Sequence, residues 1–180
     1  MLFRALLLFP HYIVLFVWTV LVLVVAPLSW ASALLIGRVP ARCHRFLAAF
    51  LRYWGQVVAW LQLLSGTYPD PLHTQEHPFR IVVPEPVRQR RLLTLFRLPL
   101  ALPAFVLASV FNVILSVSAI GAWFVALARG RTTAGLQELG TYCLRYQIEL
   151  QAYVLLLTAR YPKLEPAATP ARQLPIPGLE

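Results

Sequence analysis

Two long stretches without any charged side chain dominate the pattern of apolar and polar positions. Residues 5–37 and residues 98–128 contain no Asp, Glu, Lys or Arg. Each stretch is longer than the roughly 20 residues that a helix needs to cross the ~30 Å hydrocarbon core of a bilayer. The apolar region of a signal peptide has only about 7–15 residues, so the first stretch is too long for one. The pattern predicts two membrane-embedded helices, with a kink or break at Pro27 in the first.

A second, less apolar helix is expected after each stretch, over residues 42–65 and 134–158. Small and polar side chains recur there at steps of three and four, which places them on one helix face. Such a helix either lies in the membrane interface with its arginines at the headgroups, or crosses the membrane with this face against another helix. The face consists of Arg45, Ala49, Arg52, Gln56, Ala59 and Gln62 in the first helix, and of Glu138, Tyr142, Arg145, Glu149 and Ala152 in the second.

The chain is internally duplicated, because a shift of 93 residues aligns its two halves without a gap. Unrelated apolar helices would share Leu and Val, but not rarer residues in strict register. The rarer identical pairs are Trp30 with Trp123, Gly37-Arg38 with Gly130-Arg131, Arg52-Tyr53 with Arg145-Tyr146, and Tyr68-Pro69 with Tyr161-Pro162. The expected fold is therefore all-α integral membrane, with two tandem repeats. Each repeat contains a long hydrophobic transmembrane helix, or a kinked helical hairpin, and an amphipathic interfacial or spanning helix.

Proline and charge divide the chain into four segments. Residues 1–69 form the first membrane repeat and residues 92–162 the second. Residues 70–91 are expected to be a Pro/Arg-rich extramembrane linker, and residues 163–180 a disordered Pro-rich tail. An interfacial helix is expected over residues 86–97. If both helices of each repeat cross the membrane, the N-terminus, the linker and the tail share one side.

Composition and charge support lipid as the solvent and as a partner. Apolar residues make up 59% and charged residues 13% of the chain, against about 45–50% and 25% in soluble domains. The net charge of +9 comes from fifteen arginines and one lysine. Because the arginines lie at the ends of apolar runs, they favour anionic lipid headgroups over nucleic acid. The candidate residues for contact with lipid headgroups or a partner protein are Arg38, Arg52, Arg88, Arg90, Arg91, Arg131 and Arg145.

The two arginines of the predicted second helices differ in their neighbours. Arg145 precedes Glu149 by one helical turn and can pair with it. Arg52 has Gln56 at the same spacing and no acid nearby along the chain. An arginine at membrane depth normally has a partner. Arg52 therefore either reaches lipid phosphates from an in-plane helix, or binds an acid of another subunit or an anionic lipid.

Residues that carry catalysis or hold metals are sparse in this sequence. His73 and His77 flank Glu76 one turn apart, but no third ligand follows from the sequence, so we expect no metal site. His11 is expected to be an interfacial polar tip of the first membrane helix, and Cys43 and Cys143 to be small buried residues. No nucleotide-binding or zinc-protease motif occurs. We therefore expect neither enzymatic activity nor a cofactor.

The turn and the closing segment resemble an uncharacterised family of prokaryotic membrane proteins, described only as a domain of unknown function. Its members carry a "GRYP" turn and end in "LLTDRYPPF", similar to Gly37-Arg38-Val39-Pro40 and to residues 155–162. Val39 and Thr132 replace the turn tyrosine, and Ala159 replaces the aspartate. The resemblance covers most of residues 2–162. It implies a duplicated membrane architecture and no particular activity.

The expected function is that of a non-catalytic integral membrane protein, an accessory or scaffold subunit of a larger membrane complex. It would be a multi-pass protein of the prokaryotic inner membrane, with anionic lipid headgroups and other membrane-protein subunits as partners. An alternative is an anionic-lipid-binding or membrane-shaping protein. A second alternative is a component of an oligomeric transporter, because duplicated halves are common in carriers.

Overall fold

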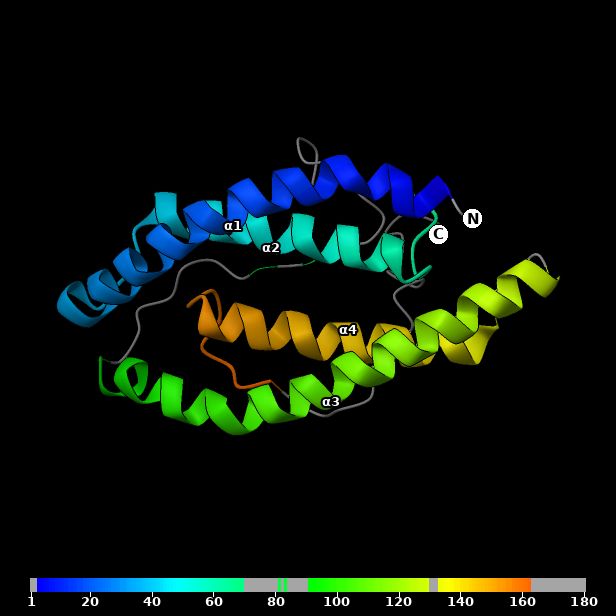
Figure 1. Cartoon of the computed structure of the whole chain (residues 1–180). Coiled ribbons are helices and arrows are strands. Elements are labelled where there is room, and N and C mark those ends of the chain that lie inside the picture. Colours follow the sequence, from blue (N-terminus) through cyan, green and yellow to red (C-terminus); the bar gives the residue numbers. More distant parts are fainter. Residues whose placement is uncertain (1–2, 70–80, 82, 84–90, 130–132, 163–180) are drawn as a thin grey trace, which may run out of the picture.

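The computed structural model describes residues 3–69, 81, 83, 91–129 and 133–162. In this part of the chain the regular structure is entirely α-helical (Figure 1). The helices are α1 (Phe3–Ile36), α2 (Ala41–Leu61), α3 (Arg91–Arg129) and α4 (Ala134–Val154). They reproduce the predicted order of a long apolar helix and a shorter helix in each half of the chain.

The two long helices run unbroken through their prolines. Pro10 and Pro27 lie inside α1, and Pro99 and Pro103 lie inside α3. The sequence predicted a kink or a break at Pro27; of these the break is wrong, and so is the alternative of a helical hairpin. A proline removes one N–H donor and crowds the preceding turn, which a long helix can accommodate by bending. Both helices are visibly curved (Figure 1).

Helix α3 includes most of the residues for which a separate interfacial helix, residues 86–97, was expected. From Arg91 onward these residues form the first turns of α3, while residues 86–90 lie outside the described part. The predicted separate element is therefore absent where the structure describes the chain. The apolar stretch that follows needs no new nucleus, since extending an existing helix costs much less than starting one.

The shorter helices α2 and α4 end one turn earlier than predicted, and for the same reason. Leu63 and the equivalent Leu156 both adopt a positive φ of 61°. This conformation turns the chain back, so that the N–H groups of Leu64 and Ser65 both donate to the Ala59 carbonyl, at 2.9 and 3.2 Å. The second repeat makes the same pair of hydrogen bonds to Ala152. The left-handed residue thus satisfies carbonyls that a helix end leaves free.

The two helical hairpins pack against each other in opposite directions (Figure 1). Helices α2 and α4 lie side by side in the centre, with α1 and α3 on the outside. The Trp30 indole N–H donates to the Val154 carbonyl over 3.1 Å, which joins the last turns of α1 to the end of α4. At the opposite end, the Tyr68 hydroxyl donates to the Leu7 carbonyl over 3.4 Å. Each half therefore begins where the other half has its turn.

This arrangement changes the expected course of the linker. Helix α2 ends at one end of the bundle, whereas α3 begins at the other (Figure 1). The expectation that the N-terminus, the linker and the tail share one side therefore fails, because the linker connects opposite ends. Ile81 and Val83, its two described residues, pack against the hydrophobic core. The reason is the opposite direction of the two halves, which the periodicity of the sequence does not contain.

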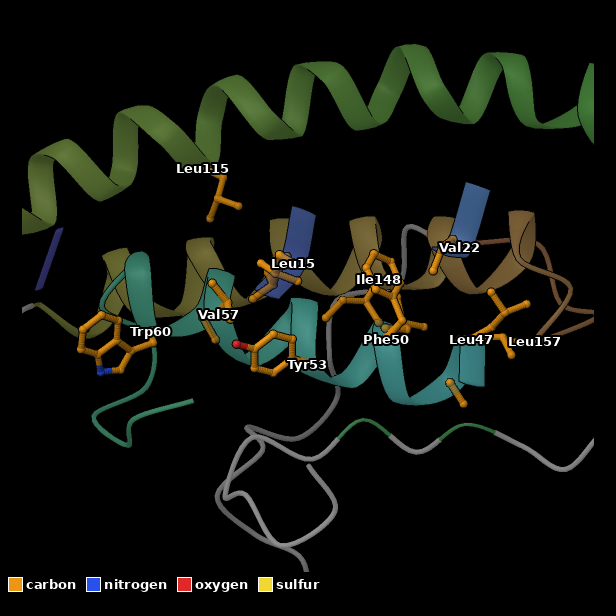
Figure 2. Packing of buried hydrophobic residues seen from close by; sticks show 14 of the residues in the cluster. Leu15, Val22, Leu47, Phe50, Tyr53, Val57, Trp60, Leu115, Ile148 and Leu157 are labelled. Atoms are coloured by element: carbon orange, nitrogen blue, oxygen red, sulfur yellow. The ribbon is translucent and has the colours of Figure 1, made fainter. Parts of the chain in front are cut away.

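The main hydrophobic core lies around α2 and receives side chains from all four helices. Figure 2 shows Leu15 of α1, Tyr53 of α2, Leu115 of α3 and Ile148 of α4 converging on it. The small and polar face of α2 is partly buried here, since Ala59 is fully covered. This face of α2 therefore packs in part against other helices, while Arg45 at its start is exposed.

A buried histidine–tyrosine pair ties α1 to α2. His11 is 6% exposed, and its Nδ1 lies 2.6 Å from the hydroxyl of the fully buried Tyr53. The ring of Tyr68 contacts the same imidazole edge-on, with centroids 4.7 Å apart. His11 is therefore a core residue and not an exposed interfacial tip. At the equivalent positions of the second repeat, Ala104 and Tyr146 stand in their place.

The outer surfaces of α1 and α3 are exposed and apolar. Both helices are long and apolar enough to cross a membrane, over Leu7–Ile36 and Thr94–Leu127. A buried core helix of a soluble protein can pass the same test, but only 17% of the apolar window of each helix is buried. Exposed large side chains include Phe9, Phe16, Leu23 and Leu35 of α1, and Val106, Val117, Phe124 and Leu127 of α3. Exposed apolar surfaces of this kind mark places where a membrane or another protein covers the chain.

We predict that Tyr53→Phe lowers the free energy of unfolding in detergent by about 1–3 kcal/mol. The substitution leaves the buried His11 Nδ1 without its hydrogen-bond partner, which costs the desolvation of that atom. The control is Tyr146→Phe, because alanine stands at the position equivalent to His11, so this variant should lose about 0.5 kcal/mol or less. Equal losses in the two variants, measured by denaturant unfolding, would show that the hydrogen bond contributes nothing specific.

Candidate functional site

The turn between α1 and α2 exposes a group of arginines. Gly37 ends α1 with a φ of 76°, and its N–H donates to the Ala33 carbonyl over 3.0 Å. The next residues alternate, so that Arg38 is exposed while Val39 is buried. Pro40 then occupies the N-cap position, with φ −56° and ψ 135°, and α2 begins at Ala41. Val39 therefore packs into the protein at this turn, and Arg38 lies at the surface.

Further arginines join Arg38 at the same end of the bundle. Arg42 and Arg45 lie in the first turns of α2 and are exposed. Arg160 follows α4 and is exposed too. The two segments meet because Val39 packs in one small cluster with Leu156. We call Arg38, Arg42, Arg45 and Arg160 the basic end.

Nothing in the described part of the chain neutralises the basic end. Among the described residues, none of its four guanidinium groups forms an ion pair. The ion pair described in this part of the chain joins Arg145 to Glu149 instead. In addition, α2 begins there without a side-chain cap, so its first-turn N–H groups point toward the same region. Positive charge and free N–H donors together favour an anion.

The other predicted arginines are placed differently. Arg52 is half-buried in the middle of α2 and donates through Nε to the Ile81 carbonyl over 3.2 Å. Arg145 lies in the middle of α4 and pairs with Glu149 at 2.8 Å, as its spacing suggested. Arg88, Arg90 and Arg131 lie outside the described residues, and Arg91 is described in its backbone alone. Of the seven predicted arginines, Arg38 is thus the one whose described side chain belongs to the basic end.

Sequence reasoning missed Arg42 and Arg160 as members of this group, and placed Arg45 on a helix face. Arg42 and Arg45 could have been found from their spacing after the turn arginine. Arg160 could not, because it reaches this end through the opposite direction of the second repeat.

Arg97 is a buried arginine with a structural role. It is 5% exposed, and its Nη1 donates to the Tyr153 carbonyl over 3.2 Å. Its guanidinium carbon lies 4.7 Å from the centre of the Tyr153 ring, in cation–π contact. Arg97 therefore fastens the start of α3 to the end of α4, and its charge faces inward.

Comparison with known proteins agrees with the duplicated architecture. The sequence profile of a family described as "Domain of unknown function (DUF4389)" matches residues 1–73 and residues 91–164. The chain belongs to this family. No curated protein and no solved structure matches the chain. The two matched segments correspond to the two helical hairpins, so each hairpin is one copy of the family domain.

Side chains that could hold a metal ion or react as thiols are the next candidates in the two copies of the DUF4389 domain. The described residues contain no group of three or more His, Cys, Asp or Glu placed to hold a metal ion. Cys143 is buried as expected, while Cys43 is half-buried. His73 and His77 lie outside the described residues.

His44 is buried near the basic end and occurs in one copy of the domain alone. Its Nε2 is buried without a hydrogen-bond partner. Burial is the largest influence on the pKa of its imidazole and lowers it; the Leu157 backbone opposes this shift, and the charge on Arg52 adds to it. The neutral form is therefore favoured in the folded chain. Gln137 stands at the equivalent position of the second copy.

We predict that the protein loses stability as the pH falls below about 6.5, the ordinary histidine pKa. Because the pKa of folded His44 is lowered, the unfolded chain binds the proton first, and this contribution to stability is fully present only above that pH. His44→Gln, which introduces the residue of the second copy, should reduce this pH dependence. The measurement is the unfolding midpoint in detergent between pH 5 and 8 for both proteins. An unchanged slope in the variant would remove His44 from the explanation.

Proposed function

We propose that this protein is a non-catalytic integral membrane protein that binds anionic lipid headgroups through its basic end. The single observation that supports this is the adjacency of two surfaces. Leu35 and Ile36, at the last turn of the apolar α1, are 75% and 67% exposed, and the exposed Arg38 follows after Gly37. Apolar surface that passes into exposed arginines is the arrangement that a membrane and its phosphate layer require.

In this proposal α1 and α3 lie in the hydrocarbon core of the prokaryotic inner membrane. Arg38, Arg42, Arg45 and Arg160 then reach the phosphate layer at one end of the bundle. Arginine suits this role, because its planar guanidinium can donate two hydrogen bonds to one phosphate. Each basic residue near an anionic surface contributes about 1 kcal/mol to the attraction.

Membrane residence is the first point to test. We expect the full-length protein to remain in the membrane pellet after extraction with alkaline carbonate, because such treatment releases proteins held by charge alone. The apolar surfaces of α1 and α3 should keep it there until detergent is added. Recovery in the supernatant of a detergent-free lysate would rule out the proposal.

We further predict that the triple variant Arg38→Gln, Arg42→Gln, Arg45→Gln binds anionic lipid at least tenfold more weakly. Three lost contacts of about 1 kcal/mol each exceed that factor even with partial screening by salt. The measurement is the affinity of detergent-solubilised protein for phosphatidylglycerol relative to phosphatidylcholine.

The matched control is Arg145→Gln, which removes an arginine that already pairs with Glu149. It should bind phosphatidylglycerol like the natural protein. If the triple variant and the control lose affinity equally, the basic end has no special role and the net charge accounts for binding.

A second candidate function is that of an accessory or scaffold subunit of a membrane complex. It is favoured by polar side chains in the middle of the otherwise apolar α3, where Ser109, Asn112 and Ser116 are exposed. The Asn112 carboxamide oxygen accepts a hydrogen bond from Gln147 over 3.3 Å. Exposed polar groups at membrane depth are typical of surfaces that another helix covers.

For this second function we predict that Asn112→Leu releases a stoichiometric partner during purification in mild detergent. The substitution removes a side chain that can form a hydrogen bond to a helix of the partner. Loss of one such bond in a membrane costs about 0.6–2 kcal/mol, which lowers retention of the partner roughly threefold or more. Val113→Leu, on the adjacent exposed position of α3, is the control. Retention of the same partner by all three proteins would argue against a contact at this face.

A further inference from the structure

The opposite directions of the two hairpins make this chain an inverted repeat. The end of α1 and the start of α3 lie at the same end of the bundle (Figure 1). Trp30 of α1 donates there to the Val154 carbonyl of α4. Arg97 of α3 donates to the adjacent Tyr153 carbonyl. The basic end therefore contains the turn of the first copy with the start and the end of the second copy. The opposite end contains the same segments with the copies exchanged.

Three exposed arginines distinguish the basic end from the opposite end. The shift of 93 residues gives each of them a counterpart in the other copy, and none of these counterparts is basic. All six positions are exposed, so packing does not decide which residue stands there. Because the copies run in opposite directions, the counterparts lie at the opposite end (Figure 1). The pairs are Arg42 with Gly135, Arg45 with Glu138, and Arg160 with Thr67.

The other arginines near the ends of the long helices do not cancel this difference. Some are shared by both copies, and these pairs are Arg4 with Arg97 and Arg38 with Arg131. Arg91 begins α3 and Arg129 ends it, so these two offset each other. Two more directly precede α3 along the sequence and have no counterpart, namely Arg88 and Arg90. The segments that flank the apolar helices are therefore more basic on one side than on the other.

Charge of this kind decides how a membrane protein is oriented. The excess of Lys and Arg in short segments beside membrane helices sets the orientation, with the more basic side in the cytoplasm. The negative surface potential of the cytoplasmic leaflet acts in the same direction. An inverted repeat presents similar apolar surfaces to the bilayer in either orientation, so its apolar helices do not make this choice. The unequal ends of the bundle do.

We propose that the basic end is the cytoplasmic end of this protein, and that Arg42, Arg45 and Arg160 fix this orientation. The anionic headgroups that it binds are then those of the cytoplasmic leaflet. The opposite end, with Thr67 and Glu138, faces the other side of the membrane. This inference rests on the membrane placement in the proposed function, and it adds the side on which the lipid partner lies.

The test places a single cysteine at equivalent positions of the two ends, in the full chain with both natural cysteines replaced by alanine. Gly66 and Ala159 are such a pair, and both are exposed. A Cβ at Gly66 meets no atom within 4 Å, so a cysteine fits there. Intact cells are treated with a maleimide that cannot cross the inner membrane. We expect Gly66→Cys to react at least tenfold faster than Ala159→Cys, and both to react alike after the cells are broken by sonication.

An exchange variant tests whether the three arginines fix the orientation. It gives each position of the three pairs the residue of its counterpart, so its composition and net charge are those of the natural chain. We expect about half of the molecules to be labelled in intact cells at either cysteine, because the flanking segments then carry similar charge. The control is Arg145→Gln, in the middle of α4, which should leave the labelling unchanged. The six substitutions are Arg42→Gly, Arg45→Glu, Arg160→Thr, Gly135→Arg, Glu138→Arg and Thr67→Arg.

Faster labelling of Ala159→Cys in intact cells, or equal labelling of the two cysteines, would overturn the proposal. So would an exchange variant that is labelled like the natural arrangement. Extraction with alkaline carbonate separates these results from a failure of the proposed function. Protein that stays in the pellet but has the wrong labelling contradicts the orientation alone, whereas recovery in the detergent-free supernatant contradicts membrane residence as well.

Discussion

The contact between the two repeats is the constraint on which the structure depends. Each repeat pairs a long apolar helix with a shorter one, and the two shorter helices also pack against each other. Packing α2 against α4 buries these surfaces together, in a core that draws on all four helices. The consequence is that α1 and α3 lie outside, where their apolar surfaces remain exposed. The exposed apolar surfaces of the long helices and the folded core thus have the same origin.

The helices were predictable because their signals are local. Charge-free stretches marked α1 and α3, and the three- and four-residue steps marked α2 and α4. The ends of α2 and α4 were less predictable, since they depend on a left-handed leucine, Leu63 or Leu156, for which the residue type gives no warning. The direction of packing was not predictable at all. It decides that Arg160 joins Arg38 at the basic end, and that Arg52 meets the carbonyl of Ile81.

Several polar contacts of this chain occur where the two copies of the domain differ. His11 has a buried tyrosine partner, and its equivalent is Ala104. Arg145 pairs with Glu149, whereas Arg52 has Gln56 at that spacing and holds the linker instead. Shared features, such as the paired caps and the contact of Trp60 with Tyr68 or of Tyr153 with Tyr161, build the scaffold. A duplicated domain can keep its fold through such shared contacts while each copy acquires its own polar groups.

The role of Arg52 follows from the opposite directions of the halves. With α1 and α3 across a membrane, the linker must connect one side to the other, and Ile81 and Val83 run beside the middle of the bundle. Non-helical backbone is tolerated at that depth only where protein buries it and satisfies its polar groups. Both residues pack against the core, and Arg52 donates to the Ile81 carbonyl. Arg52, which has no acid nearby along the sequence, thus satisfies one of these backbone carbonyls.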